Sequence, residues 1–117
     1  MAESSLRDKS KEFAKSVVFL CCEMKNNKRE TVLINQLLRS ATSIGANIYE
    51  AQYAQGKKDF VSKLEIALKE ASETGYWLEL LFRTKYIDEQ TFKALSSKCT
   101  SLRAMLIASC RTAKENG

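Results

Sequence analysis

Residues 34–51 read INQLLRSATSIGANIYEA, and this stretch carries the clearest structural pattern in the chain. Its apolar side chains recur at alternating spacings of three and four residues, which places them on one stripe of an α-helix. Gly45 on this stripe is expected to let a neighbouring helix approach closely, and Gly56 to end the helix in the left-handed conformation. We therefore predict a helix over about 30–55, with a buried stripe of Ile34, Leu37, Ala41, Ile44, Ile48 and Ala51.

Three further segments, over about 4–26, 59–85 and 88–113, show the same periodicity. Asp59 and Asp88 stand at the starts of the last two, and aspartate is a typical N-cap residue. Short polar connections join the four helices, so consecutive helices must run antiparallel. The sequence thus predicts an all-α, up-and-down (antiparallel) four-helix bundle. The additional stripes comprise Leu6, Phe13, Val17, Leu20 and Met24, then Phe60, Leu64, Ala67, Ala71, Leu78 and Phe82, then Phe92, Leu95, Cys99, Leu102, Leu106, Cys110 and Ala113.

The composition is that of one small globular domain over residues 1–117. It includes no proline and four glycines, so the strongest helix breakers are nearly absent. No run approaches the roughly 20 apolar residues that a membrane span needs, and the N-terminus lacks the apolar stretch of a signal peptide. We therefore expect a cytoplasmic protein that makes no contact with membranes.

Residues that usually carry catalysis or bind metals are scarce. The chain has no histidine, no glycine-rich phosphate loop and no nucleophile motif. Its cysteines lack CxxC spacing, and adjacent cysteines on a helix point about 100° apart, so we expect reduced thiols buried as small apolar side chains. The sequence thus predicts no enzyme, no metal, no cofactor and no small-molecule substrate. The four cysteines are Cys21, Cys22, Cys99 and Cys110.

Two groups of side chains outside the predicted core are candidates for a protein interface. One is a polar stripe on the helix over 30–55, and the other consists of aromatic and apolar side chains, which are enriched at interfaces. A second copy of the chain is the simplest partner. The alternatives are a solvated face for the stripe and cover by neighbouring side chains for the aromatics. The stripe comprises Arg39, Ser43, Asn47 and Glu50, and the second group Tyr49, Tyr53, Tyr76, Trp77 and Leu80.

Lysine and arginine are in excess, with 19 against 14 aspartates and glutamates, giving a net charge of +5. In an up-and-down bundle many of them gather near the loops at both ends, where clustered cations can contact the phosphates of RNA or DNA. The alternative is that they keep the protein soluble and complement helix C-termini. One end would hold Lys25, Lys28, Arg29, Arg83 and Lys85, and the other Lys57 and Lys58 with Arg111 and Lys114.

The middle of the chain resembles a known family. The segments LLRSATSIGANIYEAQ at 37–52 and DFVSKLEIALKEASETGYWLELL at 59–81 are similar to four-helix-bundle proteins encoded in intervening sequences of bacterial large-subunit ribosomal RNA genes. Where relatives commonly read Asn-Ile-Ala-Glu-Gly, this chain has Asn-Ile-Tyr-Glu-Ala over 47–51. The residues that match the family pattern are Arg39, Ser40, Ser43, Asn47, Glu50, Leu64, Ala67, Glu73, Tyr76, Leu78 and Leu81.

The resemblance carries expectations about function. The same family includes the accessory variability determinant proteins of diversity-generating retroelements, which form five-fold rings, bind nucleic acid and associate with a reverse transcriptase. It therefore implies a pentameric, ring-forming protein without catalytic activity. Our first hypothesis is a homo-oligomeric accessory or scaffolding protein that binds RNA or DNA. The alternative is a protein-interaction module, such as a partner of a reverse transcriptase or another enzyme, with no direct nucleic-acid contact.

Overall fold

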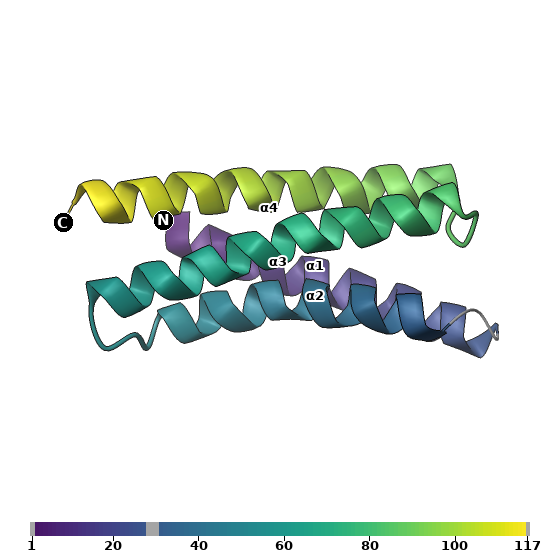
Figure 1. The fold of residues 1–117 in the computed structure, drawn as a ribbon, viewed down its shortest axis with the longest axis horizontal. Helices are drawn as coiled ribbons and strands as arrows, with labels where there is room; N and C mark the ends of the chain where they lie inside the picture. The colour runs from purple at the N-terminus through teal and green to yellow at the C-terminus, as the bar shows by residue number, and fades with distance from the viewer. Residues whose placement is uncertain (1, 28–30, 117) are drawn as a thin grey trace.

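Long antiparallel helices make up the part of the chain that the computed structural model describes, residues 2–27 and 31–116. They run alternately up and down along a body of 48 × 22 × 20 Å (Figure 1). The all-α, up-and-down four-helix bundle that the sequence predicts is therefore confirmed. The helices are α1 (Ala2–Asn26), α2 (Thr31–Ala51), α3 (Lys57–Arg83) and α4 (Glu89–Glu115).

Each helix packs beside its neighbours in the sequence, and α1 and α4 close the bundle. The α2–α3 seam is the most extensive contact and the α1–α4 seam the least. In Figure 1, α1 begins close to α4 and ends beside the start of α2. A cavity of about 340 Å³ opens on the α1–α4 seam, and the buried side chains of Phe13 and Leu102 help to line it. The bundle is thus less tightly closed between its first and last helices.

The predicted apolar stripes form the core. Every stripe residue predicted for α2 is buried, as are most of those predicted for the other helices. Several of the larger stripe residues are only partly buried, among them Leu20, Phe60, Phe82 and Phe92. Phe82 and Phe92 stack almost parallel near one end of the bundle, with their ring centroids 4.5 Å apart. Heptad spacing therefore identified the buried face of each helix.

A pair of hydroxyl groups lies inside the core, where the apolar pattern gave no indication of polar residues. Thr74 Oγ1 of α3 lies 2.9 Å from Ser40 Oγ of α2, and both residues are fully buried. Ser40 Oγ also donates to Leu37 O at 3.2 Å, and Thr74 Oγ1 to Glu70 O at 2.8 Å. Backbone carbonyls one turn earlier thus satisfy both hydroxyls, which makes their burial acceptable.

The cysteines are free thiols, as the sequence predicts, but they are not all buried. Cys21 and Cys99 donate to the backbone carbonyls of Ile34 and Ala71, and burial raises the pKa of each thiol to about 11. Cys110 is also buried. The expectation of burial is wrong for Cys22, which is exposed because it faces away from the bundle one position after Cys21.

The connection between α2 and α3 differs from the prediction. The second helix ends at Ala51 rather than near 55, and three consecutive turn bonds follow, from the N–H groups of residues 52–54 to carbonyls three residues earlier. Gly56 has φ 160°, which is extended backbone, so it does not end α2 in the left-handed conformation. It is instead the N-cap of α3, because that helix begins at Lys57. Asp59 therefore lies in the first turn, where its carboxylate accepts from Gln55 N at 3.2 Å.

The connection between α3 and α4 confirms one predicted cap and shows an unusual turn. Asp88 caps α4 by accepting from Thr91 N at 2.7 Å, and this bond lowers its pKa. At the end of α3, Lys85 has φ 68°, a left-handed value that glycine adopts more readily. The N–H of Tyr86 donates to Leu81 O at 2.8 Å and that of Lys85 to Phe82 O at 3.0 Å. This is a Schellman motif built without glycine.

Two glycines inside helices meet different surroundings. A Cβ atom added to Gly45 would lie 3.5 Å from Ser10 Oγ and 3.7 Å from Ser10 O of α1, so the two helices approach closely there, as expected. A Cβ atom added to Gly75 of α3 would meet nothing within 4 Å. Gly75 instead helps to line a cavity of about 270 Å³ on the α3–α4 seam. Only Gly45 therefore serves close helix packing.

Candidate nucleic-acid and partner interfaces

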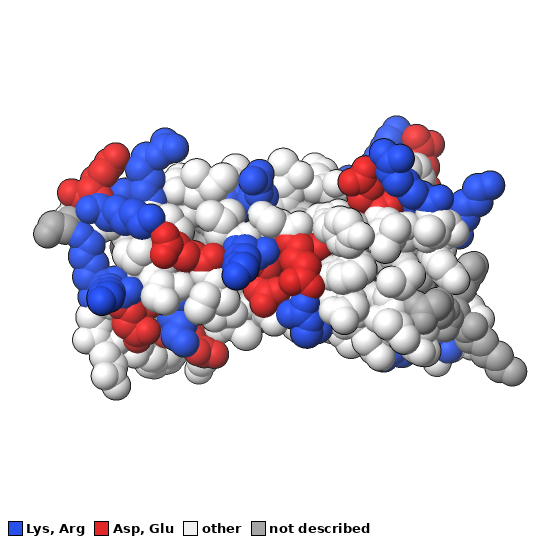
Figure 2. Space-filling model, viewed as in Figure 1, with Lys and Arg blue, Asp and Glu red and all other residues white. Residues whose placement is uncertain are grey.

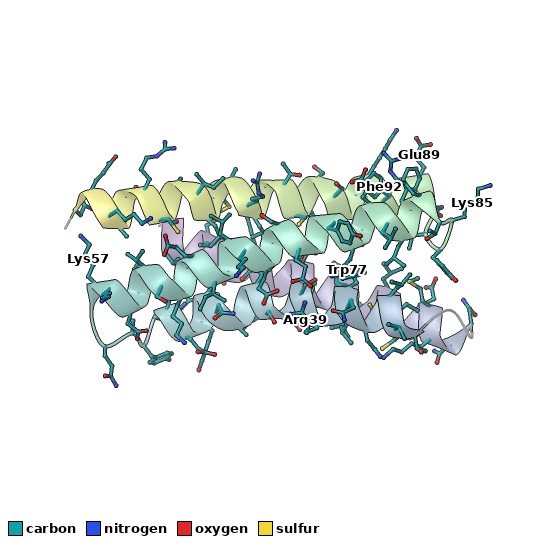
Figure 3. The ribbon with its side chains drawn as sticks, in the orientation of Figure 1. Arg39, Lys57, Trp77, Lys85, Glu89 and Phe92 are labelled. Carbon is teal, nitrogen blue, oxygen red and sulfur yellow. The ribbon has the colours of Figure 1, made fainter. Side chains whose placement is uncertain are left out.

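An ion-pair network spans the outer side of the α2–α3 seam. We call it the Arg39 network; its members are Arg39 of α2 and Glu70, Glu73 and Trp77 of α3. Arg39 Nη1 lies 3.3 Å from Glu70 Oε1, Arg39 Nη2 donates to Glu73, and Trp77 Nε1 donates to the same Glu73 carboxylate at 2.9 Å. Figure 3 shows Arg39 and Trp77 on the two adjacent helices. Hydrogen bonds from Trp77 and Arg39 lower the pKa of Glu73, and the bond with Glu73 raises that of Arg39.

The rest of the predicted polar stripe lies along the same border of α2. Asn47 Nδ2 donates to Ser43 O at 2.8 Å, one turn back in the helix. Glu50 pairs with Lys63 of α3 at 3.1 Å. Ion pairs therefore connect both ends of the stripe, Arg39 and Glu50, to α3. The sequence did not identify the partners Glu70, Glu73 and Lys63, although Glu73 and Trp77 are spaced one turn apart.

The aromatic side chains predicted on α3 differ in exposure. Tyr76 is 58% exposed, whereas Trp77 is half-buried and packs against the core. The two rings meet edge to face, with centroids 4.9 Å apart. Leu80 is half-buried, and Ile66, which sequence reasoning missed, is 39% exposed. The exposed apolar side chains on α3 are therefore Tyr76, beside Trp77, and Ile66, one turn before Glu70.

Tyr49, near the end of α2, and Tyr53, in the turns that follow the helix, lie on the other side of it from the Arg39 network. Gln52, the first residue after α2, accepts from Arg7 Nη1 of α1 at 3.0 Å, so the end of α2 borders α1. Hydrogen bonding with Tyr49 raises the pKa of Tyr53, and the nearby Arg7 charge opposes that rise. The structure thus divides the predicted interface residues between two surfaces, one along the α2–α3 seam and one toward α1.

The end of the bundle where α1 and α3 finish mixes charges of both signs. Arg83 pairs with Glu79 at 3.0 Å. Lys85 lines a cavity of about 480 Å³ together with Glu23, Asp88 and Glu89, and Figure 3 shows Lys85 and Glu89 at this end. Lys25 is exposed at the end of α1. Two predicted members of this cluster, Lys28 and Arg29, lie outside the described residues.

At the opposite end, where α3 begins and α4 finishes, several of the described cations have no ion-pair partner among the described residues. Figure 2 shows lysine and arginine side chains gathered there, with some acidic side chains among them. Lys114 pairs with Glu65 at 2.7 Å. Within residues 2–27 and 31–116, Lys57, Lys58 and Arg111 make no ion pair. We call these three residues the Lys57 end; Figure 3 labels Lys57 at this position.

Metal-binding clusters and membrane-spanning helices are absent from the part of the chain that the structure describes. It holds no group of three or more histidine, cysteine, aspartate or glutamate side chains placed to bind a metal ion. None of its helices combines the length and apolar character needed to cross a membrane.

Comparisons with known proteins agree with this architecture. The model of the 23S rRNA-intervening sequence protein family matches residues 3–108. A crystal structure of a protein of unknown function from the S23 ribosomal protein family, from Bacteroides thetaiotaomicron VPI-5482, is 47% identical to this chain. The match covers 95% of this chain and 99% of that one, with a TM-score of 0.92. No curated protein matches the chain.

Proposed function

Because the chain belongs to the 23S rRNA-intervening sequence protein family, we propose that it is a non-catalytic, homo-oligomeric protein that binds nucleic acid, RNA in the first place. It would act as an accessory or scaffolding protein. The five-subunit ring is the arrangement that the family resemblance implies. The observation that carries nucleic-acid binding is the group of unpaired cations at the Lys57 end.

Among the residues that the structure describes, those of the Lys57 end support phosphate binding better than Arg83 and Lys85 at the opposite end do. Lys57 and Lys58 form the start of α3, whose N-cap, Gly56, provides no side-chain hydrogen bond. The free N–H groups and the helix dipole make this a positive end, where lysines are unfavourable on their own and a phosphate is favourable. At the other end, Glu79 already pairs with Arg83, and three acidic residues line the same cavity as Lys85.

Charge reversal at the Lys57 end tests this proposal. The Lys57→Glu/Lys58→Glu variant is expected to bind RNA at least ten times more weakly at low salt, because two phosphate contacts are lost and repulsion replaces them. The slope of log affinity against log salt should also become shallower by about 1.5 to 2. Fluorescence anisotropy with a labelled RNA at several salt concentrations measures both quantities.

A charge-matched control is available at the other end. The Arg83→Glu/Lys85→Glu variant changes the net charge by the same amount as the Lys57→Glu/Lys58→Glu variant. It therefore shows how much affinity is lost through the change in net charge alone. It should reduce affinity clearly less than the first variant does. Equal losses from the two variants, or no binding of the unaltered protein to RNA at low salt, would contradict the proposal.

A second candidate function, protein interaction without nucleic-acid contact, is favoured by the surface beside the Arg39 network. There Tyr76 and Ile66 are exposed next to side chains that two ion pairs and an indole hydrogen bond hold in place. Exposed apolar surface of this kind suits an interface. The partner would be a second copy of the chain, a reverse transcriptase or another enzyme.

The oligomer can be tested by light scattering. The Tyr76→Arg variant is expected to lower the particle mass to that of the 13.2 kDa chain, because it introduces a charge into the interface. Phe19, an aromatic residue on α1 that is 64% exposed, provides a matched control, and Phe19→Arg should leave the mass unchanged. This interface would be ruled out for self-association by either of two results. The unaltered protein could have a particle mass of 13.2 kDa, that of a monomer, or the Tyr76→Arg variant could have the same particle mass as the unaltered protein.

A further inference from the structure

Two exposed tyrosine rings lie where α2 ends beside α1, one from Tyr49 near the end of the helix and one from Tyr53 in the turns that follow it. Tyr49 is 54% exposed and Tyr53 69%. Their ring centroids lie 5.3 Å apart, and the ring planes are tilted by 48°. Because the rings contact each other at this angle, each still has surface open to solvent. Such a pair leaves much aromatic surface in water, which is unusual without a ligand or partner.

Cationic side chains lie beside the rings. Arg7 of α1 is held next to them by its hydrogen bond to Gln52, at 3.0 Å. Lys57 follows Tyr53 by four residues, so at most about 14 Å of backbone separates them. The tyrosine pair therefore lies at the same end of the bundle as Lys57, Lys58 and Arg111, which make no ion pair within residues 2–27 and 31–116.

This combination fits single-stranded nucleic acid. Proteins that bind single strands combine a basic surface, which contacts the phosphates, with aromatic rings on which unpaired bases stack. Bases in a duplex are stacked on one another, so their faces are not available to the tyrosines. We propose that Tyr49 and Tyr53 form a base-stacking platform for single-stranded RNA, with Arg7 and the Lys57 end holding its backbone. The inference rests on the proposed nucleic-acid binding and adds the form of the ligand.

A protein partner is the competing occupant of these rings, and the structure favours the nucleic acid. The residues of the Arg39 network and Tyr76 lie toward α3, whereas the tyrosine pair lies toward α1. The apolar side chains suited to self-association are therefore on another surface. The neighbour that the structure shows for the tyrosine pair on α1 is a cation, Arg7.

The test compares a 12-nucleotide oligouridine with a 12-base-pair RNA duplex as labelled probes. The Tyr49→Ala/Tyr53→Ala variant is expected to bind the oligouridine at least tenfold more weakly, because each lost stacking contact weakens binding severalfold or more. Its affinity for the duplex should stay within about twofold of the unaltered protein. The matched control is Tyr49→Phe/Tyr53→Phe, which keeps both rings and should keep single-strand binding. Circular dichroism verifies that the variants remain helical.

Each outcome has a distinct meaning. Undiminished oligouridine binding by the alanine variant, or an equal loss of both probes, overturns the stacking platform. If the phenylalanine variant also binds the oligouridine more weakly, the platform is overturned too, because the hydroxyl groups and not the rings would then account for binding. A lower particle mass of the alanine variant would assign the rings to a subunit interface and likewise overturn it. The nucleic-acid function itself fails if neither probe binds, or if the Lys57→Glu/Lys58→Glu variant binds both probes as tightly as the unaltered protein does.

Discussion

Replacing Phe13 by alanine is expected to lower the free energy of unfolding by about 3–5 kcal/mol, the largest loss we predict for a single substitution. Phe13 is 1% exposed and helps to line the 340 Å³ cavity between α1 and α4. Removing the ring would enlarge a space that the least extensive helix contact already leaves open, so little of it can be recovered by repacking. A domain of this size has a total stability of only about 6–18 kcal/mol. Urea unfolding followed by circular dichroism measures the loss.

Phe19 provides the matched control, because it is the same residue type on the same helix but is 64% exposed. The Phe19→Ala variant should change the free energy of unfolding by no more than about 0.5 kcal/mol. Similar losses for the two variants would contradict the assignment of the two rings to the inner and outer faces of α1.

Enlarging Ala67 to leucine is expected to lower the free energy of unfolding by about 1–3 kcal/mol. Ala67 is fully buried in α3 within the core cluster, so the added methyl and methylene groups must displace neighbours from their preferred rotamers. The melting temperature should fall by about 4–12 °C in a thermal scan followed by circular dichroism.

Gly75, on the same helix, has room for a larger side chain, whereas Ala67 has none. Because nothing lies within 4 Å of a Cβ atom added there, alanine meets no obstruction and gains helix propensity. The Gly75→Ala variant should therefore be more stable by up to about 1 kcal/mol. A destabilised Gly75→Ala variant, or an Ala67→Leu variant as stable as the unaltered protein, would show that the packing of α3 differs from the one described.

The fold was predictable because each helix repeats its apolar residues in the same way over five or more turns. A pattern of that length leaves little choice of secondary structure, and short connections then determine the topology. The helix ends were less predictable. Asp59 and Gly56 are both acceptable N-cap residues, and the turn after Ala51 decided between them by starting α3 at Lys57.

The candidate site could be predicted only in part. Periodicity within one helix shows which residues leave the core, but not which neighbouring helix reaches them. Arg39 was correctly placed outside the core, yet its partners Glu70 and Glu73 belong to another helix. For the same reason, the sequence did not show that Tyr49 lies toward α1 whereas Arg39 lies toward α3. Thr74 was missed because its hydroxyl is satisfied by a backbone carbonyl, which makes a polar residue acceptable in the core.

The weak α1–α4 seam also bears on how the chain folds. The three other helix pairs join segments adjacent in sequence, so each can form as a hairpin after a short loop closes. Such local contacts favour folding in the microsecond to millisecond range. Docking α1 onto α4 requires the two ends of the chain to meet and adds the least contact in return. We therefore expect the α2–α3 hairpin to form early in folding and the pairing of the terminal helices to complete the bundle late.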